Sequence, residues 1–201
     1  MKILDGAINK LETMEATFSE CFPYPSLSSA STDFKAIDPA TESNEKVAKA
    51  VSTSLDEIAS VAQDVKAIEV FLHLHIPKME DGNNFGVTVQ LALLKQLSDL
   101  EEMASKKIDE LSGYSSARAD ALDKLKLPST SYSVTKSSSQ SETDGKKEQK
   151  LSESTEEKKS SSDTTGPAFQ TRVAALVATD TLYYSKAKQA FQSVMTLYMA
   201  V

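Results

Sequence analysis

Apolar residues recur at three- and four-residue spacing along four stretches of the chain, which predicts four amphipathic helices. The stretches cover approximately residues 1–22, 44–76, 84–125 and 167–201. Asn44 is a candidate N-cap for the second stretch, because its side-chain oxygen can accept a hydrogen bond from the first helical turn. At 1.5 Å per residue, the second and third helices are roughly 45 and 55–60 Å long.

Two segments between these helices lack the apolar periodicity. Residues 26–43 are rich in Ser, Thr, Asp and Pro and are predicted to be a linker. Residues 129–166 are nearly half serine and threonine, with Lys and Glu alternating and few large apolar groups. Such a segment buries too little surface to offset its ordering entropy, so we predict a disordered insert. The predicted division is 1–128 (three helices), 129–166 (insert) and 167–201 (the fourth helix).

The connection between the second and third helices is short, so these two long helices must lie antiparallel. The expected fold is therefore all-α, a four-helix bundle with up-down-up-down order. Six glycines and six prolines in 201 residues agree with this expectation, because an all-β domain needs turn residues every ~8–12 residues.

Composition and charge exclude several classes of function. The 22 basic and 29 acidic residues give a net charge of −7, which offers no electrostatic support for nucleic-acid binding. No apolar run approaches the ~18 residues of a membrane span, and the first residues lack the apolar core of a signal peptide. We therefore expect a soluble intracellular protein, cytoplasmic or nuclear, with no nucleic-acid or membrane partner.

Few residues are candidates for chemistry. His73 and His75 project in roughly opposite directions from a helix, so they cannot bind one metal ion. Cys21 lies on an apolar face and is expected to be a buried thiol. Glu101 and Glu102 are expected to be solvated rather than an acid–base pair. No nucleotide-binding, hydrolase or metal motif is present. We therefore expect a protein that is not an enzyme and has no catalytic residues, metal or cofactor.

The loop between the second and third helices has the most specific sequence, Ile76-Pro77-Lys78-Met79-Glu80-Asp81-Gly82-Asn83-Asn84-Phe85-Gly86-Val87. Pro77 can stop a helix, Asp81-Gly82 can turn the chain and Asn84 can cap the next helix. These structural roles leave Phe85 and Gly86 unexplained, since an early helical glycine costs ~1 kcal/mol relative to alanine. The pattern favours a functional loop.

This loop closely resembles the activation loop of the 11S proteasome activators, the REG family of non-ATPase regulators of the 20S proteasome. The likeness continues upstream to Asn44 and downstream through Gly113-Tyr114-Ser115-Ser116-Ala117-Arg118. It includes the run Glu20-Cys21-Phe22-Pro23 and, more weakly, Asp180, Tyr184 and Tyr198 in the last helix.

The resemblance implies an ATP-independent activator that docks on the α-subunits of the 20S proteasome and opens its substrate gate, stimulating peptide hydrolysis. It implies a heptameric ring of four-helix subunits, formed by this chain alone or with paralogues. Carried over by position, the gate contact is an activation loop made of Glu80, Asp81, Gly82, Asn83, Asn84, Phe85 and Gly86.

Two features depart from the family pattern. The Lys/Glu-rich insert lies between helices three and four, whereas family members with such an insert usually carry it between helices one and two. In the family a docking tail follows the position of Tyr198, whereas this chain ends at Val201, so we expect a truncated fourth helix. The alternative is therefore a helical interaction subunit that joins the ring without opening the gate.

Overall fold

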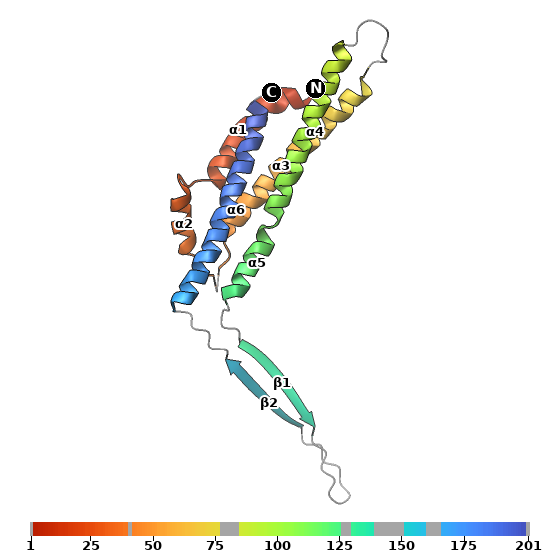
Figure 1. Ribbon diagram of the computed structural model, residues 1–201. Helices are drawn as coiled ribbons and strands as arrows, with labels where there is room; N and C mark the ends of the chain where they lie inside the picture. Colours follow the sequence, from red (N-terminus) through yellow and green to blue (C-terminus); the bar gives the residue numbers. More distant parts are fainter. Residues whose placement is uncertain are drawn as a thin grey trace, which may run out of the picture.

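The computed structural model describes residues 2–39, 42–76, 85–125, 130–138, 151–159 and 166–199. Its body is an elongated group of helices (Figure 1). Their bounds are Lys2–Cys21 for α1, Leu27–Lys35 for α2, Glu45–Leu74 for α3, Phe85–Ser112 for α4, Tyr114–Leu125 for α5 and Pro167–Met199 for α6. The predicted all-α fold is confirmed for this body.

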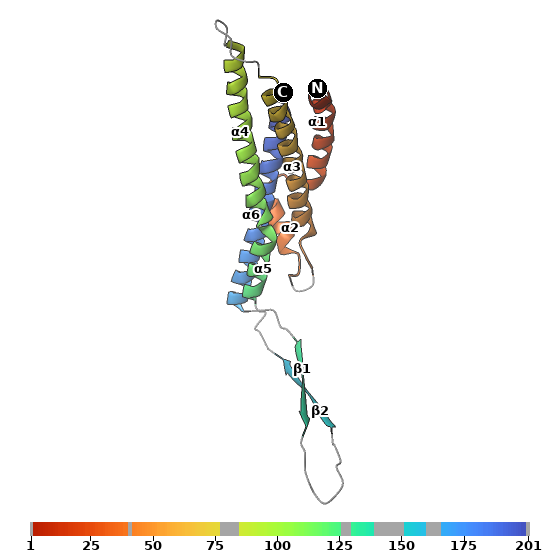
Figure 2. The same cartoon turned by 90° about the vertical axis from the view of Figure 1, so that its right-hand side faces the viewer.

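The long helices alternate in direction. Figure 1 shows α1 and the α4–α5 pair running away from the end that carries both labelled termini, while α3 and α6 run toward it. α3 packs against α4 and α6, and α6 also contacts α1, α2 and α5. Figure 2 shows the same elongated arrangement from the side, with α3 and α6 between the outer helices.

The core lies where α1, α2, α3 and α6 meet. It contains a cluster of aromatic rings, in which Phe22 lies 5.3 Å from Tyr184 and 5.9 Å from Phe191 between centroids. Phe34 brings α2 into the same cluster, at 5.6 Å from the Tyr184 ring. Large, well-buried rings in contact stabilise a core beyond the area that they bury.

The presence of the helix α2 shows that the prediction of a plain linker over 26–43 is wrong. Ser26 caps this helix by accepting a hydrogen bond from the Ser29 backbone, and the Ser29 side chain returns the contact in a capping box. Ala30 and Phe34, four residues apart, are the buried positions of the helix. The prediction failed because Ser and Thr on the exposed face of a short helix resemble a linker in composition.

Gly113 divides the third predicted helix, which was expected to be continuous to about 125, into α4 and α5. Glycine weakens helix continuation because of its backbone freedom. The space at this position is also tight, since a Cβ added to Gly113 would lie 3.1 Å from the Tyr183 hydroxyl. The missing Cβ of Gly113 therefore leaves room for the Tyr183 side chain of α6 at this level.

Two strands lie within the segment predicted to be disordered. β1 (Thr130–Ser138) and β2 (Leu151–Lys159) pair antiparallel, with Val134 opposite Thr155 and Lys136 opposite Glu153. The structure differs from the prediction over these two stretches, and the Thr, Tyr and Val content of β1 favours extended backbone. Figures 1 and 2 show the strands apart from the helices, at the end opposite the last turn of α3 and the start of α4.

Within the described part of the chain, none of the helices is long and apolar enough to cross a membrane.

Candidate functional site

The predicted activation loop connects α3 to α4 at one end of the molecule. Five of its predicted contact residues, Glu80 to Asn84, lie outside the described residues. Phe85 and Gly86 are described: both are exposed, and Phe85 is the first residue of α4, with 77% of its surface accessible. Phe85 is therefore accessible to a partner, whereas its contact with one stays a prediction.

The two helix ends beside the loop are joined by a polar contact. Gln90 Nε2 of α4 donates a hydrogen bond to the carbonyl oxygen of His75, at 3.4 Å. His75 is the C-cap of α3, and its backbone N–H bonds the Leu72 carbonyl. On α4, Val87 and Leu94 are buried and anchor the start of the helix. The loop therefore leaves from two helix ends that are held together.

His75 is further fixed by Phe71, one turn before it. The two rings are stacked with centroids 4.1 Å apart, and His75 Nδ1 lies 2.7 Å from the Phe71 carbonyl oxygen. This geometry favours the tautomer in which Nδ1 carries a proton and donates it to the carbonyl. His73 instead lies beside Glu69, with 3.8 Å between Nε2 and Oε1. The two histidines are thus separately engaged.

Gly86 has no steric reason within the chain to be glycine. A Cβ built at this position meets no atom within 4 Å, and the residue lies in the first turn of α4. Since glycine in a helix is less stable than alanine by ~1 kcal/mol, its presence destabilises the start of α4 without a benefit that the described residues account for. Close approach of another molecule to this backbone would account for it.

A buried polar cluster lies near the other end of the bundle. Asp180 of α6, 3% exposed, accepts hydrogen bonds from three side chains, two on α5 and one at the start of α3. Its Oδ1 binds the Tyr114 hydroxyl at 3.0 Å and Arg118 Nε at 3.2 Å, both on α5. Its Oδ2 binds Asn44 Nδ2 at 2.9 Å. The cluster therefore ties the start of α3 and α5 to α6.

Asn44 uses both ends of its side-chain amide. Its Oδ1 accepts from the Val47 backbone N–H at 3.3 Å, so the predicted N-cap of α3 is confirmed. Burial raises the pKa of the Tyr114 phenol above its ordinary value, with the Asp180 carboxylate as a second cause. Tyr114 therefore stays protonated and able to donate to Asp180.

The cluster was not predicted, although a sequence signal for it exists. Asp180 falls on the apolar stripe of the last helix, where a carboxylate needs buried partners. In the sequence, Tyr114 and Arg118 stand out only as points of resemblance. A charged residue at a core position thus indicates a buried hydrogen-bond network, but its partners can be identified only from the fold.

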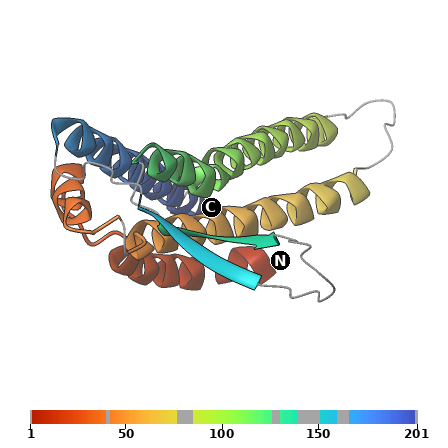
Figure 3. The same cartoon turned by 90° about the horizontal axis from the view of Figure 1, so that it is seen from below.

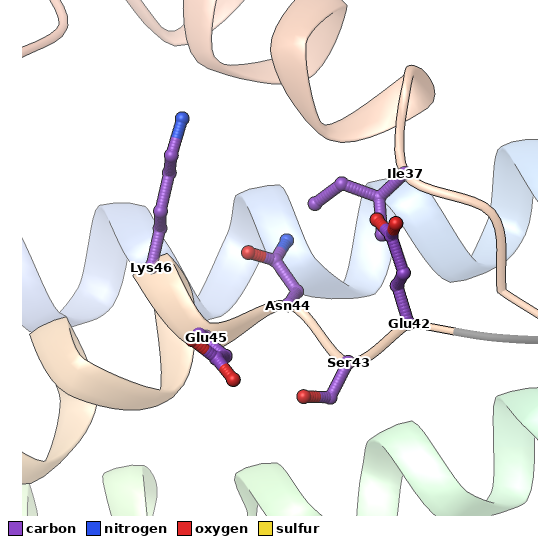
Figure 4. A pocket seen from close by; sticks show the side chains of 6 residues that line it. All are labelled: Ile37, Glu42, Ser43, Asn44, Glu45 and Lys46. Carbon is purple, nitrogen blue, oxygen red and sulfur yellow. The ribbon is translucent and has the colours of Figure 1, made fainter.

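An open cavity of about 520 Å³ lies at the entrance to α3 (Figure 4). Its lining consists of Ile37, Glu42, Ser43, Asn44, Glu45 and Lys46. The Asn44 amide is already bonded to Val47 and Asp180, and the Lys46 ammonium binds Asp33 at 2.6 Å and Tyr24 at 2.9 Å. The cavity lies far along α3 from the loop, so it is not part of the candidate site.

Other residues considered for chemistry have structural partners. Cys21 is buried, as predicted, and its thiol lies 3.7 Å from the Thr53 hydroxyl. Glu101 and Glu102 pair with different lysines, Lys66 at 3.7 Å and Lys106 at 2.6 Å. No group of three or more potential metal ligands occurs among the residues that the structure describes.

Comparison with known proteins gives one family match and several relatives. Residues 40–133 match the family described as "Proteasome activator PA28, C-terminal". The chain is 30% identical over 84 residues to proteins named "Proteasome activator complex subunit 3" from Homo sapiens, Mus musculus and Gallus gallus. The aligned stretch is 42% of this chain and 33% of each relative, so it covers about a third of their length. The matched region contains α3, the loop, α4 and α5.

Proposed function

We propose, on the premise that the chain belongs to the 11S (PA28) family of proteasome activators, that it is an ATP-independent activator of the 20S proteasome. In this proposal it regulates a peptidase and is not itself an enzyme. It docks on the α-subunits and opens the substrate gate with the loop between α3 and α4. The proposed site of action is the cytoplasm or the nucleus.

The supporting observation is the placement of the loop at the joined ends of two long helices. The Gln90–His75 hydrogen bond links these ends and Val87 is buried, which favours a defined separation between the two ends of the loop. A rigid loop that binds the open gate better than the closed one shifts that equilibrium by its differential affinity. Such a mechanism needs no nucleotide.

Gly86 supports the same proposal from a second direction. A Cβ at this position would meet no atom of the chain, so packing within the chain does not explain the glycine. In a helix, glycine is also less stable than alanine. A partner surface that approaches the first turn of α4 closely would need the space that the absence of a Cβ leaves. In the proposed complex, Glu80 to Gly86 form that contact.

Several copies of the loop are expected to act together. We propose that the chain assembles into a heptameric ring, alone or with paralogues, so that the first bound loop raises the effective concentration of the others. Head-to-tail contacts between identical subunits close into rings when the rotation permits. Weak single contacts then suffice for stable docking.

The direct test is to add the purified chain to purified 20S proteasome without ATP and to follow hydrolysis of a fluorogenic peptide. The proposal expects hydrolysis to rise with the concentration of the chain and to reach a plateau. Bovine serum albumin at equal concentration is the control for non-specific stabilisation. An oligomer that binds 20S without raising hydrolysis would instead identify a non-activating interaction subunit.

A further inference from the structure

Three serines in the described part of the chain share an acidic sequence pattern. Each has one carboxylate three positions after it and a second carboxylate one or two positions after it. These serines are Ser54, Ser98 and Ser154. Carboxylates that follow a hydroxyl in this way form a charge pattern that a protein kinase with a basic cleft can select. The sequence does not distinguish the three serines, but their places in the fold do.

Ser54 lies in the interior, on the buried face of α3. Its exposed fraction is 0%. Its hydroxyl oxygen lies 2.8 Å from the Ala50 carbonyl oxygen and 3.1 Å from that of Ala187 on α6. An enzyme could reach this oxygen only after α3 and α6 had separated. Ser54 therefore has a structural role.

Ser98 is exposed but lies in the middle of α4. Because a helix turns once in 3.6 residues, Asp99 and Glu101 project from it in different directions. Glu101 also lies 3.7 Å from the Lys66 ammonium of α3. A cleft that binds an extended segment could hold these residues only after this part of α4 had unfolded, at a cost in free energy. The fold therefore protects Ser98.

Ser154 lies in β2, where the backbone is already extended. It is opposite Thr135 of β1, in a sheet of two strands, so each strand has one unpaired edge. Figures 1 and 2 show the hairpin apart from the helices, and Figure 3, seen from below, shows it in front of them. An isolated two-stranded hairpin is marginally stable, so β2 separates from β1 at little cost. Ser154 thus combines the acidic pattern with accessible backbone.

The charges around Ser154 indicate the class of enzyme that would recognise it. Glu153 precedes the serine, Glu156 and Glu157 follow it, and the nearest lysine on either side is four positions away. We propose that Ser154 is a phosphorylation site for an acid-directed serine/threonine kinase. This proposal goes beyond the proposed activation of the proteasome and does not depend on it.

The transfer uses Mg-ATP as the phosphoryl donor. The Ser154 Oγ forms a bond to the γ-phosphorus while the bond from that phosphorus to the β,γ-bridging oxygen breaks. A base of the kinase takes the hydroxyl proton, and ADP leaves. The phosphate adds a charge of about −1.5 to −2 to β2.

The test incubates the whole chain with a purified acid-directed serine/threonine kinase and Mg-ATP. Mass spectrometry follows the phosphate on each residue with time. We expect an initial rate at Ser154 that exceeds the rate at Ser98 by on the order of tenfold or more, and no phosphate on Ser54. Peptides of residues 93–104 and 149–160, which lack the fold, are expected to be phosphorylated at comparable rates.

Two double variants test the role of the acidic residues. Glu156→Gln/Glu157→Gln is expected to lower the rate at Ser154 by on the order of tenfold, because two charge-assisted contacts with the kinase are lost. Glu101→Gln/Glu102→Gln, the same change on α4, is the matched control and is expected to leave that rate unchanged.

Three results would overturn the proposal. Phosphate that appears on Ser98 of the folded chain as fast as on Ser154 would show that the fold does not select the site. A rate at Ser154 that is unchanged in Glu156→Gln/Glu157→Gln would refute recognition by charge. Absence of phosphate on Ser154 in the folded chain, with or without phosphorylation of the 149–160 peptide, would refute the site itself.

Discussion

Asn44 and Asp180 are joined by a hydrogen bond of 2.9 Å across 136 positions of sequence, from the first residue before α3 to the middle of α6. The same asparagine caps α3 through its Oδ1. One side chain thus begins a helix and fixes where that helix lies against α6. The N-cap was predictable from local sequence, whereas its partner depends on the fold.

Asn44→Ala is expected to lower the free energy of unfolding by about 2–3 kcal/mol. It removes an N-cap, worth ~1 kcal/mol, and also leaves a buried Asp180 oxygen without its donor. Ser26→Ala, which removes only the exposed cap of α2, is the matched control and is expected to cost ~1 kcal/mol. Urea denaturation followed by circular dichroism measures both. Equal losses would contradict the double role of Asn44.

Asp180→Ala is expected to destabilise the protein by about 3–5 kcal/mol, because Arg118 loses its buried counter-charge. Tyr114→Phe, which removes a single donor, is expected to cost ~1 kcal/mol in the native background and much less when Asp180 is already alanine. Denaturation of the two single variants and the double variant measures this coupling. Strict additivity would show that Tyr114 and Asp180 do not act as a unit.

Gly86→Ala is expected to stabilise the chain and to impair activation. Alanine favours the first turn of α4 by up to ~1 kcal/mol, and nothing within 4 Å opposes the added Cβ. Thermal denaturation measures the gain, and stimulation of 20S peptide hydrolysis measures the loss. Gly6→Ala in α1, where the added Cβ also meets nothing within 4 Å, is the control expected to leave stimulation unchanged. Full stimulation by Gly86→Ala would remove the reason proposed for this glycine.

Docking of α2 is expected to weaken in acid. The hydrogen bond from Lys46, followed by that from Tyr24, lowers the pKa of the Asp33 carboxyl below its ordinary value of 3.8. The stabilisation from this group is therefore complete above pH 3.8 and is lost as the pH falls through the lower folded pKa. Amide hydrogen exchange in α2 across this range measures the effect.

Lys46→Met is expected to reduce this acid dependence, because the carboxyl loses its main partner. Lys188→Met is the control, since Lys188 lies over the Phe18 ring at 5.7 Å and its change leaves Asp33 untouched. An acid dependence of α2 exchange that is the same in Lys46→Met and the native chain would refute the assignment to Asp33.

The long helices were predictable because their buried faces repeat every three or four residues over many turns. The period of Val47, Val51, Ile58 and Val65 in α3 is typical, and all four are buried. α2 was missed because its nine residues contain only Ala30 and Phe34 as buried anchors. The break at Gly113 depends on the approach of Tyr183 from α6, which is a distant contact that local sequence does not specify.

The candidate site was predictable in a different way. The spacing of Pro77, Gly82 and Gly86 indicates a turn. The expected function instead follows from the likeness of the loop sequence to the loop of a known family. The structure adds what lies around it: the Gln90–His75 contact, the open space at Gly86 and the exposed Phe85 side chain. None of these follows from periodicity, because each depends on how the helix ends meet or diverge.

The effect of Asn83→Ala on stimulation of the 20S proteasome tests whether the loop opens the gate. The native chain and the variant are compared for peptide hydrolysis and, by sedimentation, for oligomeric state. We predict that the native chain stimulates hydrolysis and that Asn83→Ala abolishes stimulation while the oligomer stays intact. Full stimulation by an intact Asn83→Ala oligomer would contradict the assignment of the loop as the element that opens the gate.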